Sequence, residues 1–133
     1  MGFFDWVVRI FSEYWRLFLE GTSYTVLMAL VGTVAGFLIG LIIAVIRTVP
    51  ADKEKSPVKW GIMKVVNFIL SVYVEVIRGT PMMVQALIIH YSWFARIGMP
   101  ALLSAIIIIS VNTGAYMAEI VRGGIISIDK GQV

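Results

Sequence analysis

The sequence contains no cysteine and only one histidine, and these absences exclude several kinds of site. Without cysteine the 133-residue chain can form no disulfide bond and no cysteine-based metal site, although this says nothing about its compartment. His90 stands alone, so no metal-ligand cluster is expected, and a lone histidine in an apolar helix is more often a packing residue than a ligand. No Ser, His and Asp are placed for nucleophilic catalysis, and no glycine-rich phosphate-binding loop is present. We therefore expect no catalytic residue in this chain.

Charge is also scarce, which indicates a membrane protein. Charged residues make up 14% of the chain and hydrophobic residues 59%, whereas soluble domains usually carry about 25% charge. The net charge of +3 is modest and the basic residues gather in one loop, so we expect no nucleic-acid partner. The chain is long enough for one domain or part of one. Its long apolar runs predict an all-α membrane protein in contact with lipid.

Residues 1–20 are expected to form an amphipathic helix at the membrane interface. Polar side chains recur every third or fourth residue, and aromatic side chains cover the rest of the surface. The polar stripe consists of Asp5, Arg9, Ser12, Arg16 and Glu20. These charges interrupt the apolar residues too often for a spanning helix or a signal peptide. Alternatively, this helix packs on a partner subunit.

Residues 21–46 are expected to form the first spanning helix. They carry no charge, and as a helix they would be about 39 Å long, against about 30 Å for a hydrocarbon core. Gly32, Gly36 and Gly40 recur every fourth residue and make one smooth face. In membranes such a face lets another backbone approach closely, so we expect helix packing there.

Residues 47–64 are expected to form a cytoplasmic loop, because five basic residues crowd it: Arg47, Lys53, Lys55, Lys59 and Lys64. The second connection, near residues 96–100, carries only Arg96, as suits an external loop. The first span then runs from outside to inside. The N-terminus is expected outside, and the end of the chain inside.

The second span, expected at 65–95, is interrupted by charges and helix breakers. Glu75 and Arg78 are three residues apart and share a helix face. A break is expected at 79–81, because Pro81 lacks a backbone donor and disfavours helical geometry in the residue before it. Charges and irregular backbone at membrane depth usually face protein or water. We expect this stretch to line a pathway or act as a hinge; alternatively, the two charges only anchor a helix end.

The third span is expected at 100–122. Its second half places Asn112, Tyr116 and Glu119 at positions i, i+4 and i+7, which makes one polar stripe. Arg122 can pair with Glu119 across one helical turn. Such a stripe either lines the interior of a bundle or forms a structural hydrogen-bond seam between helices.

Two stretches resemble one known family. The sequence Glu-Val-Ile-Arg-Gly-Thr-Pro-Met-Met-Val-Gln over 75–85 is similar to a segment of the permeases of ABC importers for polar amino acids. A second match covers 115–125, Ala-Tyr-Met-Ala-Glu-Ile-Val-Arg-Gly-Gly-Ile, followed by Ser-Ile-Asp-Lys-Gly-Gln over 127–132. In that family this run leads into the cytoplasmic Glu-Ala-Ala loop that docks on the ATPase. The chain stops at Val133, so the resemblance implies the N-terminal part of a longer permease.

The resemblance implies a fold, partners and candidate residues. The fold would be the transmembrane domain of a type I ABC importer, with three of its five spans in 21–133 and the amphipathic helix before them. Partners would be cytoplasmic ATP-binding subunits, a second permease subunit in a homo- or heterodimer, and an extracellular or periplasmic amino acid-binding protein. This chain would bind no cofactor, since ATP and Mg²⁺ would sit on the ATPase in the cytoplasm beneath the plasma (inner) membrane. Candidates for the pathway or hinge are Glu75, Arg78, Gly79, Thr80, Pro81, Gln85, Asn112, Tyr116 and Glu119.

A second hypothesis stays open from the residues alone. A small helical membrane scaffold or assembly protein without transport activity would use the glycine face and the amphipathic N-terminus equally well. The sequence that follows Val133 would distinguish the two, because a Glu-Ala-Ala loop and two further spans would exclude a scaffold.

The basic loop yields a test of topology. With Asp52→Cys in this cysteine-free chain, a membrane-impermeant thiol reagent should fail to label intact cells and should label permeabilised cells, because Lys53 and Lys55 lie in the cytoplasm. Strong labelling of intact cells would invert the topology.

Overall fold

Three long helices dominate the structure. The computed structural model describes residues 2–49, 54–128 and 130–132, and every regular element in these ranges is helical. The elements are α1 (Phe3–Thr48), α2 (Pro57–Gly79), α3 (Met82–Ile89), the π-helical turn η1 (His90–Phe94), the 3-10 turn η2 (Ala95–Ile97), α4 (Ala101–Ile126) and the 3-10 turn η3 (Lys130–Gln132). Helices α1, α2 and α4 are each long and apolar enough to cross a membrane.

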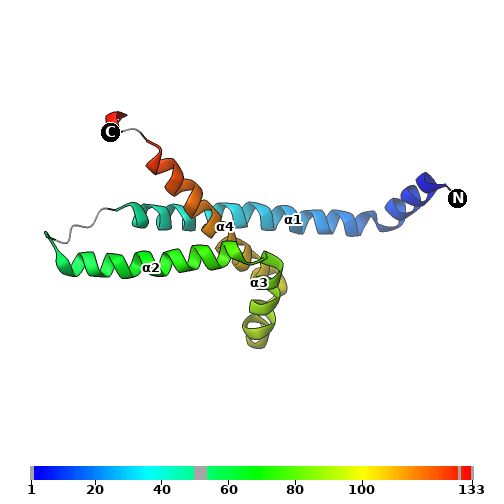
Figure 1. Cartoon of the computed structure of the whole chain (residues 1–133). Helices are drawn as coiled ribbons and strands as arrows, with labels where there is room; N and C mark the ends of the chain where they lie inside the picture. Colours follow the sequence, from blue (N-terminus) through cyan, green and yellow to red (C-terminus); the bar gives the residue numbers. More distant parts are fainter. Residues whose placement is uncertain (1, 50–53, 129, 133) are drawn as a thin grey trace.

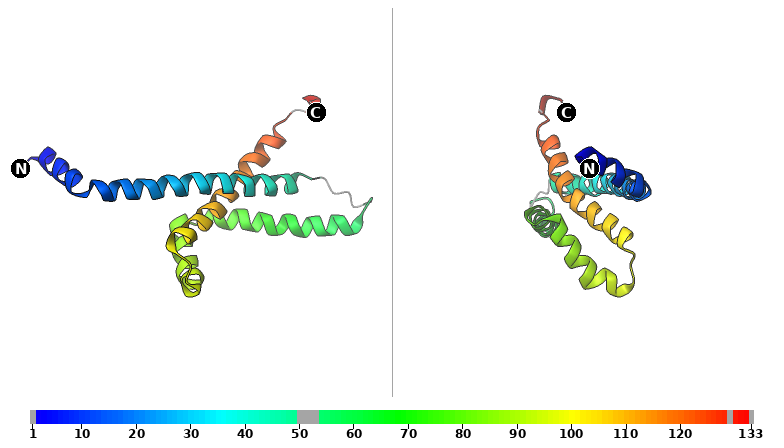
Figure 2. Two further views of the ribbon diagram at one scale, coloured as in Figure 1. Left: turned by 180° about the vertical axis from the view of Figure 1, so that it is seen from behind. Right: turned by 90° about the vertical axis from the view of Figure 1, so that its right-hand side faces the viewer.

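The helices form an open bundle around the second half of α1. Helix α2 runs beside that half, α4 crosses both, and α3 turns away from the axis of α2 (Figure 1). The first part of α1 extends beyond the other helices, and the C-terminus lies toward the end at which α1 finishes (Figures 1 and 2). The N-terminus therefore lies at the opposite end of the bundle from the end of α1 and the C-terminus.

Helix α1 joins two segments that the sequence separates. The expected interfacial helix over 1–20 and the expected span over 21–46 lie in one helical element, which is interrupted by a kink at Tyr14 and not between residues 20 and 21. No proline lies between them, and a glycine is tolerated inside a helix. The helix bends at Tyr14, whose backbone leaves the helical region (φ −115°, ψ 15°). At about 69 Å, α1 is more than twice as long as a hydrocarbon core is thick.

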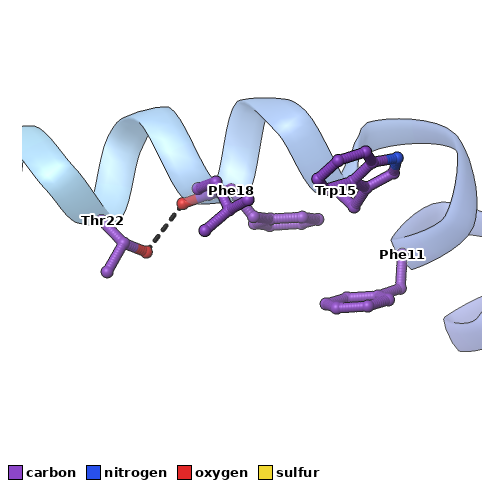
Figure 3. Close-up of a pocket in the computed structure, with 5 residues that line it drawn as sticks. Phe11, Trp15, Phe18 and Thr22 are labelled. Carbon is purple, nitrogen blue, oxygen red and sulfur yellow. Dashed lines mark hydrogen bonds between the residues drawn. The ribbon is translucent and has the colours of Figure 1, made fainter.

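An apolar groove follows α1 across this bend. It measures about 400 Å³ and is lined by Phe11, Trp15, Phe18, Leu19 and Thr22 (Figure 3). The rings of Phe11 and Phe18 stack with centroids 6.1 Å apart, and the Thr22 hydroxyl donates to the Phe18 carbonyl. The aromatic surface that the sequence placed at the interface is thus fully displayed on α1, without another helix of the described chain on it.

The connections are shorter than the sequence indicated. Helix α1 continues through Arg47 to Thr48, and α2 already begins at Pro57, so most of the expected loop over 47–64 is helical. The rigid φ of proline favours the first turn of a helix, which explains this early start. Asp52 and Lys53 lie outside the described residues. Helix α4 likewise runs past Gly123 to Ile126, because glycine keeps both backbone hydrogen-bonding groups.

Helices α1 and α4 approach each other closely over their small residues. Gly32, Gly36 and Gly40 are buried, and α4 presents a matching buried row of Ser110, Gly114 and Ala118. A Cβ built on Gly40 would lie 2.5 Å from the Met117 Cβ and 2.7 Å from the Ala118 nitrogen. These distances leave no room for a methyl group, so glycine sets the separation of the two helices.

Helix α2 completes the small core. Its Val74 packs with Ile43 of α1 and Ala118 of α4, and all three are buried. The Tyr73 hydroxyl donates to the Val111 carbonyl, which ties α2 to α4 by a polar contact as well. Most other apolar side chains of the spans are exposed, as a lipid-facing surface requires.

The glycine contact predicts a position-dependent cost of adding one methyl group. Gly40→Ala should lower the free energy of unfolding by about 1–3 kcal/mol, because the methyl group meets the α4 backbone. The control Gly21→Ala, which meets nothing within 4 Å, should be neutral or stabilising. Detergent titration of the full-length protein, followed by tryptophan fluorescence, measures both. Equal effects at the two glycines would contradict the close approach.

Candidate functional site

Three arginines from three helices surround one carboxylate. Glu119 of α4 is 2.7 Å from Arg47 of α1 and 3.0 Å from Arg122 one turn further along α4. Arg78 of α2 lies 4.0 Å from the same carboxylate. The Arg122 pairing agrees with the i,i+3 spacing in the sequence. The side chain of Glu119 is 22% exposed, so this cluster is partly sheltered from solvent.

Arg47 is the member that sequence reasoning missed as a site residue. Its sequence position predicts a place in the basic loop, yet its guanidinium reaches into the bundle and donates to both Glu119 and the Ser71 hydroxyl of α2. Glu119 is 72 positions away in the chain, so no local spacing could reveal the pair. The local signal is the position of Arg47 directly after a long uncharged stretch, because a charge at the end of such a stretch needs a partner.

Arg78 contacts α4 rather than its neighbour on α2. Its carboxylate contact is with Glu119, and its guanidinium lies 5.5 Å from the ring centroid of Tyr116. Glu75, which shares a helix face with Arg78 in the sequence, is exposed and makes no ion pair within the described chain. Of the two charged residues near the break, Arg78 therefore pairs with α4, whereas Glu75 stays exposed on α2.

The polar stripe of α4 divides between three surroundings. Asn112 is buried and donates to the amide oxygen of Gln85 on α3 at 3.1 Å. Tyr116 is 43% exposed beneath Arg78, and Glu119 belongs to the arginine cluster. The stripe thus faces the interior of the bundle at Asn112 and Glu119 and opens toward its surface at Tyr116.

The break between α2 and α3 carries the remaining candidate residues. Helix α2 ends at Gly79, Thr80 is extended with φ −119° and ψ 146°, and α3 begins after Pro81. The Thr80 hydroxyl donates to the Val76 carbonyl at 2.8 Å, which caps the end of α2. These residues lie beside Gln85, which bonds to the Thr80 carbonyl and to Asn112.

Further along, His90 pairs with a buried hydroxyl. Its Nδ1 lies 2.9 Å from the Ser104 Oγ of α4, and Ser104 is only 1% exposed. This contact gives His90 a packing role between η1 and α4. Between α3 and α4 a cavity of about 250 Å³ is lined only by Met82, Met83, Ala86, Ala105, Ile108 and Ile109, so it presents no polar side chain to a ligand.

The described part of the chain offers no metal centre, since no three of its His, Asp and Glu residues are grouped to hold an ion. The arrangement contains ion pairs and amide contacts that join helices, and these can break and re-form when helices move. These contacts hold α1, α2, α3 and α4 together.

Comparisons with known proteins identify relatives. A family model described as "Binding-protein-dependent transport system inner membrane component" matches residues 60–133. The chain is 36% identical over 122 residues to the L-cystine transport system permease protein TcyB of Bacillus subtilis (strain 168), covering 91% of this chain and 47% of that protein. It is 34% identical over 134 residues to the glutamine transport system permease protein GlnP of Escherichia coli (strain K12), covering 96% of this chain and 53% of that protein.

A solved structure is also similar. The crystal structure of an amino acid ABC transporter with histidines matches this fold with a TM-score of 0.74 at 32% sequence identity. The match covers 99% of this chain and 54% of that chain. The chain thus spans about half the length of the relatives that it matches.

The Glu119 cluster predicts energetic coupling between α1 and α4. In a double-mutant cycle of Arg47→Ala and Glu119→Ala, the unfolding free energies should show a coupling of about 1–3 kcal/mol, because the pair is partly sheltered. The control cycle replaces Arg47→Ala by Arg9→Ala on the far part of the same helix and should be additive within about 0.5 kcal/mol. Additivity at both arginines would show that the 2.7 Å contact carries no coupling energy.

Proposed function

Because the chain belongs to the family of binding-protein-dependent transport system inner membrane components, we propose that it serves as the permease subunit of an ATP-driven importer of polar amino acids. It is a multi-pass membrane protein, and α1, α2 and α4 are three spans of a type I permease fold. The observation that carries the proposal is the likeness of the whole chain to amino acid permeases, since folds alone host many functions.

In this proposal the importer works by alternating access. ATP and Mg²⁺ bind to separate cytoplasmic ATPase subunits, and this chain binds no cofactor of its own. An external binding protein delivers the amino acid, and a second permease subunit, identical or different, completes the pathway. The ATPase closes on ATP and turns the spans outward, and hydrolysis resets them. Each step requires contacts that differ between the two states.

The arrangement of the helices supports an N-terminus outside the cell. The end of α1 at Thr48 and the C-terminus lie toward one end of the bundle, and the N-terminus lies at the other (Figures 1 and 2). The excess of basic residues between the first two spans favours the cytoplasm for the former end. The family's ATPase-docking loop would follow the chain on that same side.

The polar contacts between helices support the pathway and hinge roles of the candidate residues. Glu75 and Tyr116 are exposed on the bundle, Arg78 lies between Tyr116 and Glu119, and Gln85 and Asn112 join α3 to α4. Charges within a spanning segment are usually functional because lipid disfavours them. The ion pairs between Glu119 and three arginines lie near a helix break, and they are suited to exchanging partners as the spans move.

Reconstitution tests the transport function. The full-length permease in liposomes with its ATPase and binding protein should accumulate radiolabelled polar amino acids, such as glutamine, glutamate, histidine, arginine or cystine, only when ATP is present on the ATPase side. Absence of ATP-dependent uptake for all of them would favour the scaffold hypothesis.

A single substitution tests the role of Arg78. Arg78→Ala should lower uptake more than it lowers membrane abundance, because a charge held beside the break at Pro81 bears on helix movement. Uptake per molecule is measured against immunodetected protein. The control is Arg96→Ala, an exposed arginine in η2, which should leave uptake per molecule unchanged. A proportional loss of uptake and abundance for Arg78→Ala would make Arg78 an anchor for folding.

A further inference from the structure

The break between α2 and α3 leaves carbonyls in the last turn of α2 without helical partners, and that of Ile77 is one of them. In an α-helix the carbonyl of residue i accepts from the N–H of residue i+4. For Ile77 that residue is Pro81, and proline has no N–H. A carbonyl that accepts no hydrogen bond in an apolar environment costs on the order of several kcal/mol of free energy. In the sequence Ile-Arg-Gly-Thr-Pro, the Ile77 carbonyl therefore lacks a backbone hydrogen-bond donor.

The side chain of Gln85 supplies the missing hydrogen-bond donor. Its Nε2 donates to the Ile77 carbonyl at 2.9 Å and to the Thr80 carbonyl at 3.1 Å, and it also contacts the Thr80 hydroxyl. Carbonyl oxygens only accept, so the group that faces them must be the NH₂ end of the amide. Its two N–H bonds are shared among three oxygens that all belong to the end of α2. One side chain of α3 thus caps the preceding helix.

The other end of the same amide is held by α4. With the NH₂ end turned to α2, the Gln85 oxygen faces away and accepts from the Asn112 Nδ2 at 3.1 Å. Asn112 is only 8% exposed, so few waters can replace this bond. Because both ends of the Gln85 amide are used, the direction in which α3 leaves α2 is tied to the position of α4.

We propose that Gln85 is the positioning residue of the α2–α3 hinge, in which its amide nitrogen replaces the N–H missing at Pro81 and its amide oxygen couples the hinge to Asn112. The geometry does not depend on the transported substrate. The consequence for transport rests on the proposed function: when α4 moves, the bond to Asn112 transmits the movement to the angle between α2 and α3.

Distance measurements on the protein in lipid nanodiscs test the hinge. Spin labels at Val72 of α2 and Ile88 of α3, both exposed, should give one narrow distance distribution in the wild type. Gln85→Met keeps the length of the side chain but donates to no carbonyl. It should raise the population of other α2–α3 distances about five- to tenfold, the fold-change that corresponds to losing about one net hydrogen bond. An unchanged distribution would overturn the proposal.

Restoring the missing donor is the matched control. Pro81→Ala returns an N–H and removes the proline that keeps Thr80 extended, so residue 81 can reach the Ile77 carbonyl once Thr80 becomes helical. Gln85→Met should then have little further effect on the distances in that background. If Gln85→Met broadens the distribution equally with alanine or proline at 81, Gln85 does not act by replacing the proline donor. This comparison stands even if Gln85→Met alone folds poorly, because the double variant should recover folding.

Asn112→Leu separates the two ends of the amide. It removes the bond to the Gln85 oxygen and leaves the donors to Ile77 and Thr80 in place. The α2–α3 distance should stay narrow, while labels at Ile88 and Leu103 of α4 should spread. In the full-length importer the same variant should lower uptake per molecule and preserve ATP-dependent uptake above background. Spreading of both distances would mean that Asn112 supports the whole bundle. Failure of the wild type to transport would instead count against the proposed function alone.

Discussion

The close contact between α1 and α4 sets the separation of these two helices and places Arg47 of α1 against Glu119 of α4. With glycine at 32, 36 and 40, the α1 backbone lies directly against α4, and the side chains around the contact are brought within hydrogen-bonding reach. Arg47 then meets Glu119, and Ile43 meets Ala118 in the core. In lipid, apolar side chains gain little by leaving their surroundings, so van der Waals packing and polar bonds between helices supply the attraction. A row of small residues favours both the packing and the polar bonds, because it brings the two helices closer together.

The second constraint is the need to satisfy backbone groups where water is scarce. The helix breaks at Thr80–Pro81, directly after the spanning helix α2. Here the hydroxyl of Thr80 and the amide of Gln85 bond to carbonyls at the end of α2. Wherever lipid surrounds irregular backbone, such partners are required. The break is therefore held by defined hydrogen bonds, and it can adopt a second arrangement if other hydrogen bonds replace these.

The arginine cluster follows the same rule for charge. A single carboxylate at Glu119 serves arginines of α1, α2 and α4, so all three helices share one ionic centre. Burying an ion pair costs desolvation that the attraction only partly offsets, so such a centre contributes more to the arrangement of the helices than to their net stability. In an importer that alternates between two states, an acceptor with several available donors allows partners to change without leaving a charge unpaired.

Short-range patterns in the sequence predict much of this structure, whereas contacts between residues far apart in the chain cannot be predicted from such patterns. Helical spans, the amphipathic N-terminal surface, the pairing of Glu119 with Arg122 and the family itself follow from periodicity, spacing and motif, because these depend on residues within a few turns of one another. Helix ends were less accessible: nothing local showed that α1 would continue from the interfacial segment to Thr48 or that α4 would pass Gly123. What only the tertiary structure decided are the partners. Arg47 meets a carboxylate 72 residues away, and Gln85 bonds back to α2 and across to Asn112. Such contacts depend on which helix faces lie together, and that choice is made by the packing of whole helices rather than by any short stretch of sequence.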